Sequence, residues 1–202
     1  LSLSQEKDKM MQSLNAAIID FPNDEQLLYA RAMNLDAQND LTGMEADLRV
    51  ILEKKPDNAI ALNALGYTLT DKTDRLQEAF QLIQKAHTLE PENPAILDSL
   101  GWVLFKLHRR EEALIYLLKA FQGYQDGEVA AHLGEVLWSL NQRTEALEVW
   151  LNVLNKFPKH PILLETIQRL APEVLEQIAT NQNQELSNDK VDDNSKVNSE
   201  AQ

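Results

Sequence analysis

A Leu-Gly pair recurs at nearly constant spacing through this chain, and each pair is followed by an alanine that comes directly after a glutamate. The pairs and their alanines are Leu65-Gly66 with Ala79, Leu100-Gly101 with Ala113, and Leu133-Gly134 with Ala146. Prolines 22, 56 and 91 lie 34 and 35 residues apart and keep the same register. Independent helices would not hold so many positions in one register, so the chain is predicted to repeat one structural unit.

The residue types at these positions predict a pair of antiparallel helices in each unit. Two helices approach closely only where small residues lie at their crossing, which explains a glycine facing an alanine. A glycine inside a helix costs about 1 kcal/mol relative to alanine, so three glycines in register need a packing reason. Large apolar residues such as Leu62 and Leu69 surround the glycine, and the prolines end each second helix.

Two intervals break the register. The distance from Gly66 to Ala79 is one residue longer than in the other repeats, which predicts an extra residue in the turn at 71–74. The junction between the last two repeats is one residue shorter and has Gln125 where a proline is expected. Because Gly123 and Gly127 flank this junction, we expect a shortened, locally bent connection.

A period of 34 residues in helical hairpins is typical of tetratricopeptide repeats. The predicted fold is all-α, a right-handed α-solenoid of tetratricopeptide helix-turn-helix repeats with a C-terminal capping helix. Residues 1–21 are expected to form the second helix of an incomplete repeat. The predicted domains are four repeats at 25–160 (25–58, 59–93, 94–126 and 127–160), capping helices at 161–180, and a disordered acidic tail at 181–202.

Composition and motifs exclude several functions. The 32 acidic and 19 basic residues give a net charge of −13, which disfavours binding to nucleic acid or anionic lipid. No apolar run is long enough to span a bilayer, and the chain contains no cysteine. The four histidines form no metal-binding pattern, and no phosphate loop or nucleophile elbow is present. We therefore predict no enzyme activity, no catalytic residue, no cofactor and no metal.

The first helix of each hairpin lines the inner face of such a stack, so its exposed positions predict a protein-binding groove. Tyrosine, phenylalanine and tryptophan on one face are typical of binding hot spots, and Asp36 adds a carboxylate beside them. The predicted groove consists of Tyr29, Met33, Asn63, Tyr67, Asp71, Asp98, Trp102, Phe105, His132, Glu135 and Trp138. Packing between repeats is the alternative for any one of these rings. Trp150, on a second helix, is expected in the core.

Three segments show a closer resemblance, namely LNALGYTLTDKTDRLQEA, PAILDSLGWVLFKLHRREEAL and EVAAHLGEVLWSLNQRTEAL. They resemble the C-terminal repeats of Gram-negative outer-membrane tetratricopeptide lipoproteins. One branch of that family is similar to adaptors that bind a periplasmic carboxyl-terminal processing protease and present cell-wall hydrolases to it. The resemblance implies a location on the periplasmic face of the outer membrane, with such a protease as a partner.

A second use of the fold, the carboxylate clamp for chaperone C-termini, does not match. The clamp lysine positions hold Tyr29, Asn63 and Asp98, and an acidic groove would repel a terminal carboxylate. That function is rejected for this chain.

The leading hypothesis is a non-catalytic scaffold for protein–protein interaction, acting as a bacterial envelope adaptor for a protease or its substrate. The alternatives are a cytoplasmic assembly or co-chaperone module and a regulatory repeat domain of a larger enzyme. Because the chain begins at Leu1, we interpret it as a piece of a longer protein. The N-terminal helix would then lack its partner, which predicts self-association through Met11, Leu14 and Ile18.

Overall fold

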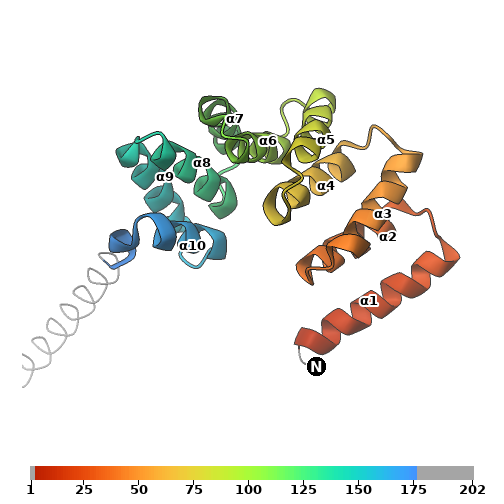
Figure 1. Cartoon of the computed structure of the whole chain (residues 1–202). Helices are drawn as coiled ribbons and strands as arrows, with labels where there is room; N and C mark the ends of the chain where they lie inside the picture. The colour runs from red at the N-terminus through yellow and green to blue at the C-terminus, as the bar shows by residue number, and fades with distance from the viewer. Residues whose placement is uncertain (1–2, 177–202) are drawn as a thin grey trace, which may run out of the picture. The chain divides into compact units, whose positions relative to one another are not determined.

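The computed structural model describes residues 3–176, which form α-helices and contain no strand (Figure 1). The helices are α1 (Leu3–Asp20), α2 (Glu25–Ala37), α3 (Leu41–Lys54), α4 (Ala59–Lys72), α5 (Leu76–Leu89), α6 (Pro94–Lys106), α7 (Arg110–Gly123), α8 (Gly127–Ser139), α9 (Arg143–Lys156) and α10 (Pro161–Leu170). A short helical segment follows at 172–176. The all-α prediction is confirmed, whereas the tail at 181–202 lies outside the described residues.

The helices pair as hairpins at the places that the register predicts. The pairs α2–α3, α4–α5, α6–α7 and α8–α9 pack together and lie within the four expected repeats. Polar side chains begin several helices, because Asp24, Asn58 and Asp126 each accept a hydrogen bond from a backbone N–H of the first turn. Proline is the first residue of α6 and of α10. Backbone N–H groups in the first turn have no acceptor within the helix, so the N–H that proline lacks is not missed there.

Glycines allow a close approach of the two helices in the hairpins α4–α5, α6–α7 and α8–α9. A Cβ added at Gly101 would lie 2.5 Å from Cγ of Leu117 and 3.1 Å from the carbonyl oxygen of Ala113. Gly66 faces Ile83 and Ala79 in the same way. The expected crossing of small residues is therefore present, with a large side chain one turn further along the second helix closing over each glycine.

The turns inside the hairpins correct one prediction. All four turns contain three residues, so the extra residue of the 59–93 repeat lengthens α4 to 14 residues and Asp71 lies inside the helix. In the other three turns the middle residue, Asn39, His108 or Asn141, has a positive φ of 60° to 65°. The turn after α4 has no such residue, and Thr73 caps the helix in an extended conformation instead.

The described residues divide into two compact units, 3–125 and 126–176. The division falls at the predicted irregular junction, where three residues separate α7 from α8 and four separate each of the other successive hairpins. The shortened connection is thus confirmed. In the second unit α10 packs on α8 and α9, with Leu163 and Ile167 fully buried, as expected for a cap.

The N-terminal helix α1 packs on α2 through Ile18, and Asn15 accepts a hydrogen bond from Arg31. Met11 and Leu14 are half-buried, and Met10 is exposed. The face that self-association would use is therefore only partly covered within the described residues, and self-association through it stays a prediction.

Candidate functional site

Eight of the eleven predicted groove residues belong to the first unit, on its three first helices α2, α4 and α6. Tyr29, Met33, Asn63, Tyr67 and Phe105 are half-buried. Helix α4 contacts α6, and Nζ of Lys72 at the end of α4 bonds the carbonyl oxygen of Asp36 at the end of α2. These contacts place the three first helices side by side.

Trp102 is not an exposed anchor. Its side chain is only 5% exposed, and its ring stacks on that of Phe105 with 5.4 Å between the centroids. The ammonium group of Lys106 lies 4.6 Å from the centre of the Trp102 ring. The buried Trp102 ring therefore packs under the Phe105 ring, and the more accessible Phe105 ring is the one that a partner would contact.

The predicted carboxylates contribute less free negative charge than the sequence indicated. Nζ of Lys72 lies 2.8 Å from Oδ1 of Asp36, and Asp98 is buried. In the second unit Arg169 forms an ion pair with Glu135 at 2.6 Å. Asp71 is the exposed carboxylate of the set. The partners of Asp36 and Glu135 lie more than thirty residues away in the chain, so sequence spacing gave no sign of these pairs.

The groove residues of the second unit are His132, Glu135 and Trp138, all on α8. His132 is buried, whereas Trp138 is half-buried and lies 5.6 Å from the ring of Trp150. The guanidinium of Arg143 lies 4.7 Å above Trp138. Trp150 is fully buried, which confirms its expected place in the core. Continuity of the groove between the two units stays a prediction.

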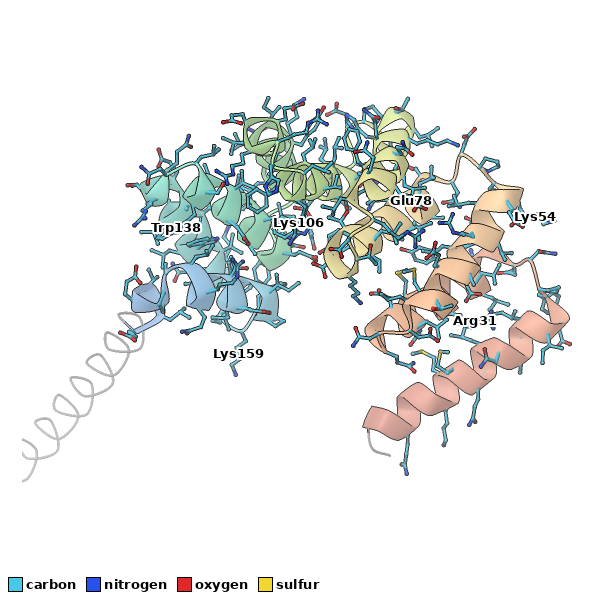
Figure 2. All side chains as sticks on the ribbon, viewed as in Figure 1. Arg31, Lys54, Glu78, Lys106, Trp138 and Lys159 are labelled. Atoms are coloured by element: carbon cyan, nitrogen blue, oxygen red, sulfur yellow. The ribbon has the colours of Figure 1, made fainter. Side chains whose placement is uncertain are left out.

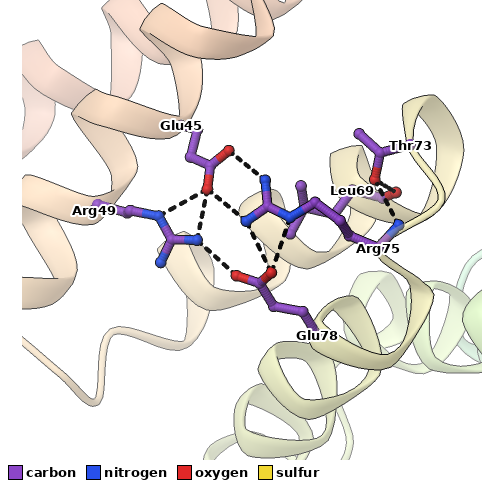
Figure 3. Close-up of polar contacts among 6 residues, drawn as sticks. All are labelled: Glu45, Arg49, Leu69, Thr73, Arg75 and Glu78. Carbon is purple, nitrogen blue, oxygen red and sulfur yellow. Dashed lines mark hydrogen bonds and ion pairs between the residues drawn. The ribbon is translucent and has the colours of Figure 1, made fainter.

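Sequence reasoning missed a cluster of four charged residues in the first unit, which we call the charge quartet (Figure 3). Glu45 and Arg49 come from α3, Arg75 from the turn after α4, and Glu78 from α5. Arg75 bonds both oxygens of Glu45 at 2.7 and 2.8 Å, and Arg49 bridges Glu45 and Glu78 at 2.6 Å. The i,i+4 spacing of Glu45 and Arg49 and the i,i+3 spacing of Arg75 and Glu78 were its only signals in the sequence.

The charge quartet predicts a loss of stability in acid. Hydrogen bonds from Arg75, and then from Arg49, lower the pKa of Glu45 from 4.5 to about 2. Because the folded-state pKa is depressed, the stabilisation is present above pH 4.5 and is lost as the pH falls toward 2. Urea unfolding of Glu45→Gln should show a weaker pH dependence in that window than the parent. Glu148→Gln, an exposed control on α9, should keep the parent's slope.

No three His, Asp or Glu side chains in the described part of the chain gather closely enough to bind a metal ion. Among the helices that the structure describes, none is long and apolar enough to cross a membrane. What the fold presents is a set of helical faces with aromatic rings, the form of a protein that binds other proteins through stacked hairpins.

Comparison with known proteins identifies the repeats. The tetratricopeptide-repeat family model matches residues 95–126. The TPR repeat-containing protein PA4667 of Pseudomonas aeruginosa is 50% identical over 135 residues, which cover 67% of this chain and 23% of that protein. The chain thus spans about a quarter of the length of this relative. Residues 95–126 thus match a tetratricopeptide repeat, and the chain is similar to a tetratricopeptide-repeat protein; such repeats imply a scaffold for protein–protein interaction.

Solved structures show the same fold. The thermophilic TPR protein TTC0263 of Thermus thermophilus superposes with a TM-score of 0.70 at 20% identity, covering 84% of this chain and 91% of that one. The pilF protein of Pseudomonas aeruginosa gives a TM-score of 0.62 at 19% identity, covering 89% of this chain and 91% of the other. At these identities the likeness concerns the fold alone.

Proposed function

We propose that this chain is a non-catalytic adaptor of the bacterial envelope that binds a protein segment along the first helices of its hairpins. The main evidence for this binding surface is the set of accessible aromatic rings in the first unit. Tyr29, Tyr67 and Phe105 come from three successive first helices, and each is half-buried rather than enclosed. Rings held firmly at the base and accessible at the edge are typical of binding hot spots.

The ligand that fits this surface is an extended or helical segment with large apolar side chains and one or two Lys or Arg. Apolar contact with the rings supplies the affinity. Asp71 is exposed and selects the sign of the partner's charge mainly by speeding its approach. Because Asp36 and Glu135 already have cationic partners, we expect only a modest dependence of affinity on salt.

The place in the envelope and the protease partner rest on the resemblance of residues 61–170 to outer-membrane tetratricopeptide lipoproteins. Fractionating the cells that make the full-length protein should place it with the outer membrane, and affinity purification should recover a processing protease or its substrate. Recovery with cytosolic chaperones would overturn the assignment in favour of the assembly-module alternative.

Truncating the accessible rings should weaken binding without loss of fold. Phe105→Ala and Tyr67→Ala should each raise the Kd of the purified partner, with a true anchor costing at least ~2 kcal/mol. Titration calorimetry gives the affinity, and circular dichroism checks the helix content. Trp102→Ala is unsuitable as a test because Trp102 is buried and its loss would disturb packing.

Ile115→Ala provides the matched control. Ile115 is an exposed apolar residue on the second helix α7, so its removal takes away similar apolar surface outside the groove. It should leave the Kd unchanged. If the Phe105 and Tyr67 variants bound as tightly as the parent while Ile115→Ala bound weakly, the working surface would lie on the second helices instead.

A further inference from the structure

A hollow of about 400 Å³ lies in the first unit beside the charge quartet and away from the predicted groove residues. Its lining residues come from α3, from the second half of α4 and from the turn that follows. They are Leu41, Thr42, Met44, Glu45, Arg49, Thr68, Leu69, Thr73 and Arg75. Met44 and Leu69 are buried, so the floor is apolar. The volume suits one large side chain rather than a whole helix.

Thr68 gives the hollow an unmatched polar group. The residue is 5% exposed, it lines the hollow, and its hydroxyl makes no hydrogen bond to any residue that the structure describes. Thr70, two residues on, bonds the carbonyl oxygen of Gly66 at 2.9 Å, and Thr73 bonds that of Leu69 at 2.7 Å. Thr68 is thus distinct from its neighbours: its hydroxyl is not bonded to a backbone carbonyl, and because it is not among the fully enclosed polar atoms without a partner, it is accessible to a ligand in the hollow.

The rim of the hollow contains Glu45, Arg49 and Arg75, and the neighbouring Glu78 brings the net charge of the charge quartet to zero. Arg49 and Arg75 are each bonded to both Glu45 and Glu78, which fixes the guanidinium planes at the entrance (Figure 3). A charged ligand would gain little from this neutral rim and would lose its hydration over the apolar floor. A flat aromatic ring would stack favourably on a guanidinium plane.

These three features together select one kind of occupant. The floor requires an apolar body, the guanidinium planes favour an aromatic ring, and Thr68 requires a single polar atom. Tyrosine carries its hydroxyl at the tip of the ring and can donate or accept, as can the hydroxyl of threonine. We propose that the hollow is a second docking site, which receives one tyrosine side chain from a partner protein.

The uncharged probes N-acetyltyrosinamide and N-acetylphenylalaninamide test this site on the intact chain. Titration of the tyrosine probe should shift the NMR signal of the Met44 methyl group in a saturable way. Thr68→Val keeps the shape of the side chain and removes its hydroxyl. It should raise the Kd of the tyrosine probe by about fivefold, the value of one neutral hydrogen bond, and leave the Kd of the phenylalanine probe unchanged.

A second variant blocks the entrance from an exposed position. Thr42→Trp should fill the mouth of the hollow and abolish binding of both probes, while Phe105→Ala in the groove should change neither Kd. The proposal is overturned if the Met44 signal does not saturate, or if Thr68→Val binds the tyrosine probe as tightly as the parent. It is also overturned if Thr42→Trp binds both probes normally, because the ligand would then lie elsewhere.

Discussion

Replacing Arg31 with methionine should lower the free energy of unfolding of the first unit by about 3 kcal/mol, because it leaves a buried carboxylate without its partner. Arg31, whose side chain is labelled in Figure 2, bonds the two oxygens of Asp47 at 2.6 and 2.7 Å, and Asp47 is 4% exposed. The same guanidinium donates to Asn15 at 3.0 Å. One side chain on α2 therefore joins α1 and α3, and urea unfolding followed by circular dichroism measures its effect.

A double variant separates the lost charge pair from lost packing. Adding Asp47→Leu to Arg31→Met removes both charges, and replacing a buried ion pair by apolar residues of similar size is often nearly neutral. The double variant should therefore recover most of the stability that the single variant loses. Equal stability of the parent and Arg31→Met would show that the Asp47 carboxylate is well solvated, contrary to its burial.

The repeat architecture could be predicted because its determinants are local and recur. Gly66, Gly101 and Gly134 each mark a close crossing, and the spacing between crossings gave the boundaries of the hairpins. The irregular junction at Gln125 was visible for the same reason, and it coincides with the division between the two compact units. The number of residues between equivalent positions of a repeat indicates the lengths of its helices and turns, because each unit contacts only its neighbours.

The side chains of the candidate site were less predictable, because their surroundings come from other repeats. The sequence positions of Trp102 and Phe105 predict that both rings lie on one face of α6. Which of the two rings is buried under the other depends on how they stack, and the sequence does not show this. The extra residue near Asp71 was placed in the turn, whereas it extends α4 and brings Lys72 to Asp36. The charge quartet joins residues up to 30 positions apart, a range that spacing on one helix cannot show.

The two proposed binding surfaces differ in what they require of a partner. The groove offers accessible rings on successive helices and can accept a long segment with variable sequence. The hollow beside Arg75 accepts a single side chain and selects it through a hydrogen bond to the hydroxyl of Thr68. A partner that uses both would combine affinity from the groove with selection at the hollow, and the two contributions would multiply in the Kd when the linker between them fits.

Replacing Gly101 with leucine should unfold the chain at a markedly lower temperature, because the close approach of α6 to α7 leaves no room for a side chain. Even the Cβ atom would lie 2.5 Å from Cγ of Leu117, which is a branch point rather than a flexible end. Overpacking costs about 1–3 kcal/mol, and a chain of this size loses about 2–4 °C in Tm for each kcal/mol. Since α6 also packs on α4 and α5, the displacement should weaken the neighbouring hairpin as well.

Gly43→Ala is the control for the change of glycine itself. An added Cβ there would lie 2.9 Å from Oδ2 of Asp40, whose carboxylate caps α3, and 3.0 Å from Cδ1 of Leu35, so these side chains must shift slightly but no backbone or branch point of the core blocks it. Alanine gains up to about 1 kcal/mol in helix propensity, which offsets a weakened cap, so this variant should unfold near the parent's temperature. Thermal unfolding followed by circular dichroism compares the three proteins. A Gly101→Leu variant that melted within a degree of the parent would mean that α6 and α7 do not cross at Gly101, and the register of the whole repeat would need to be reassigned.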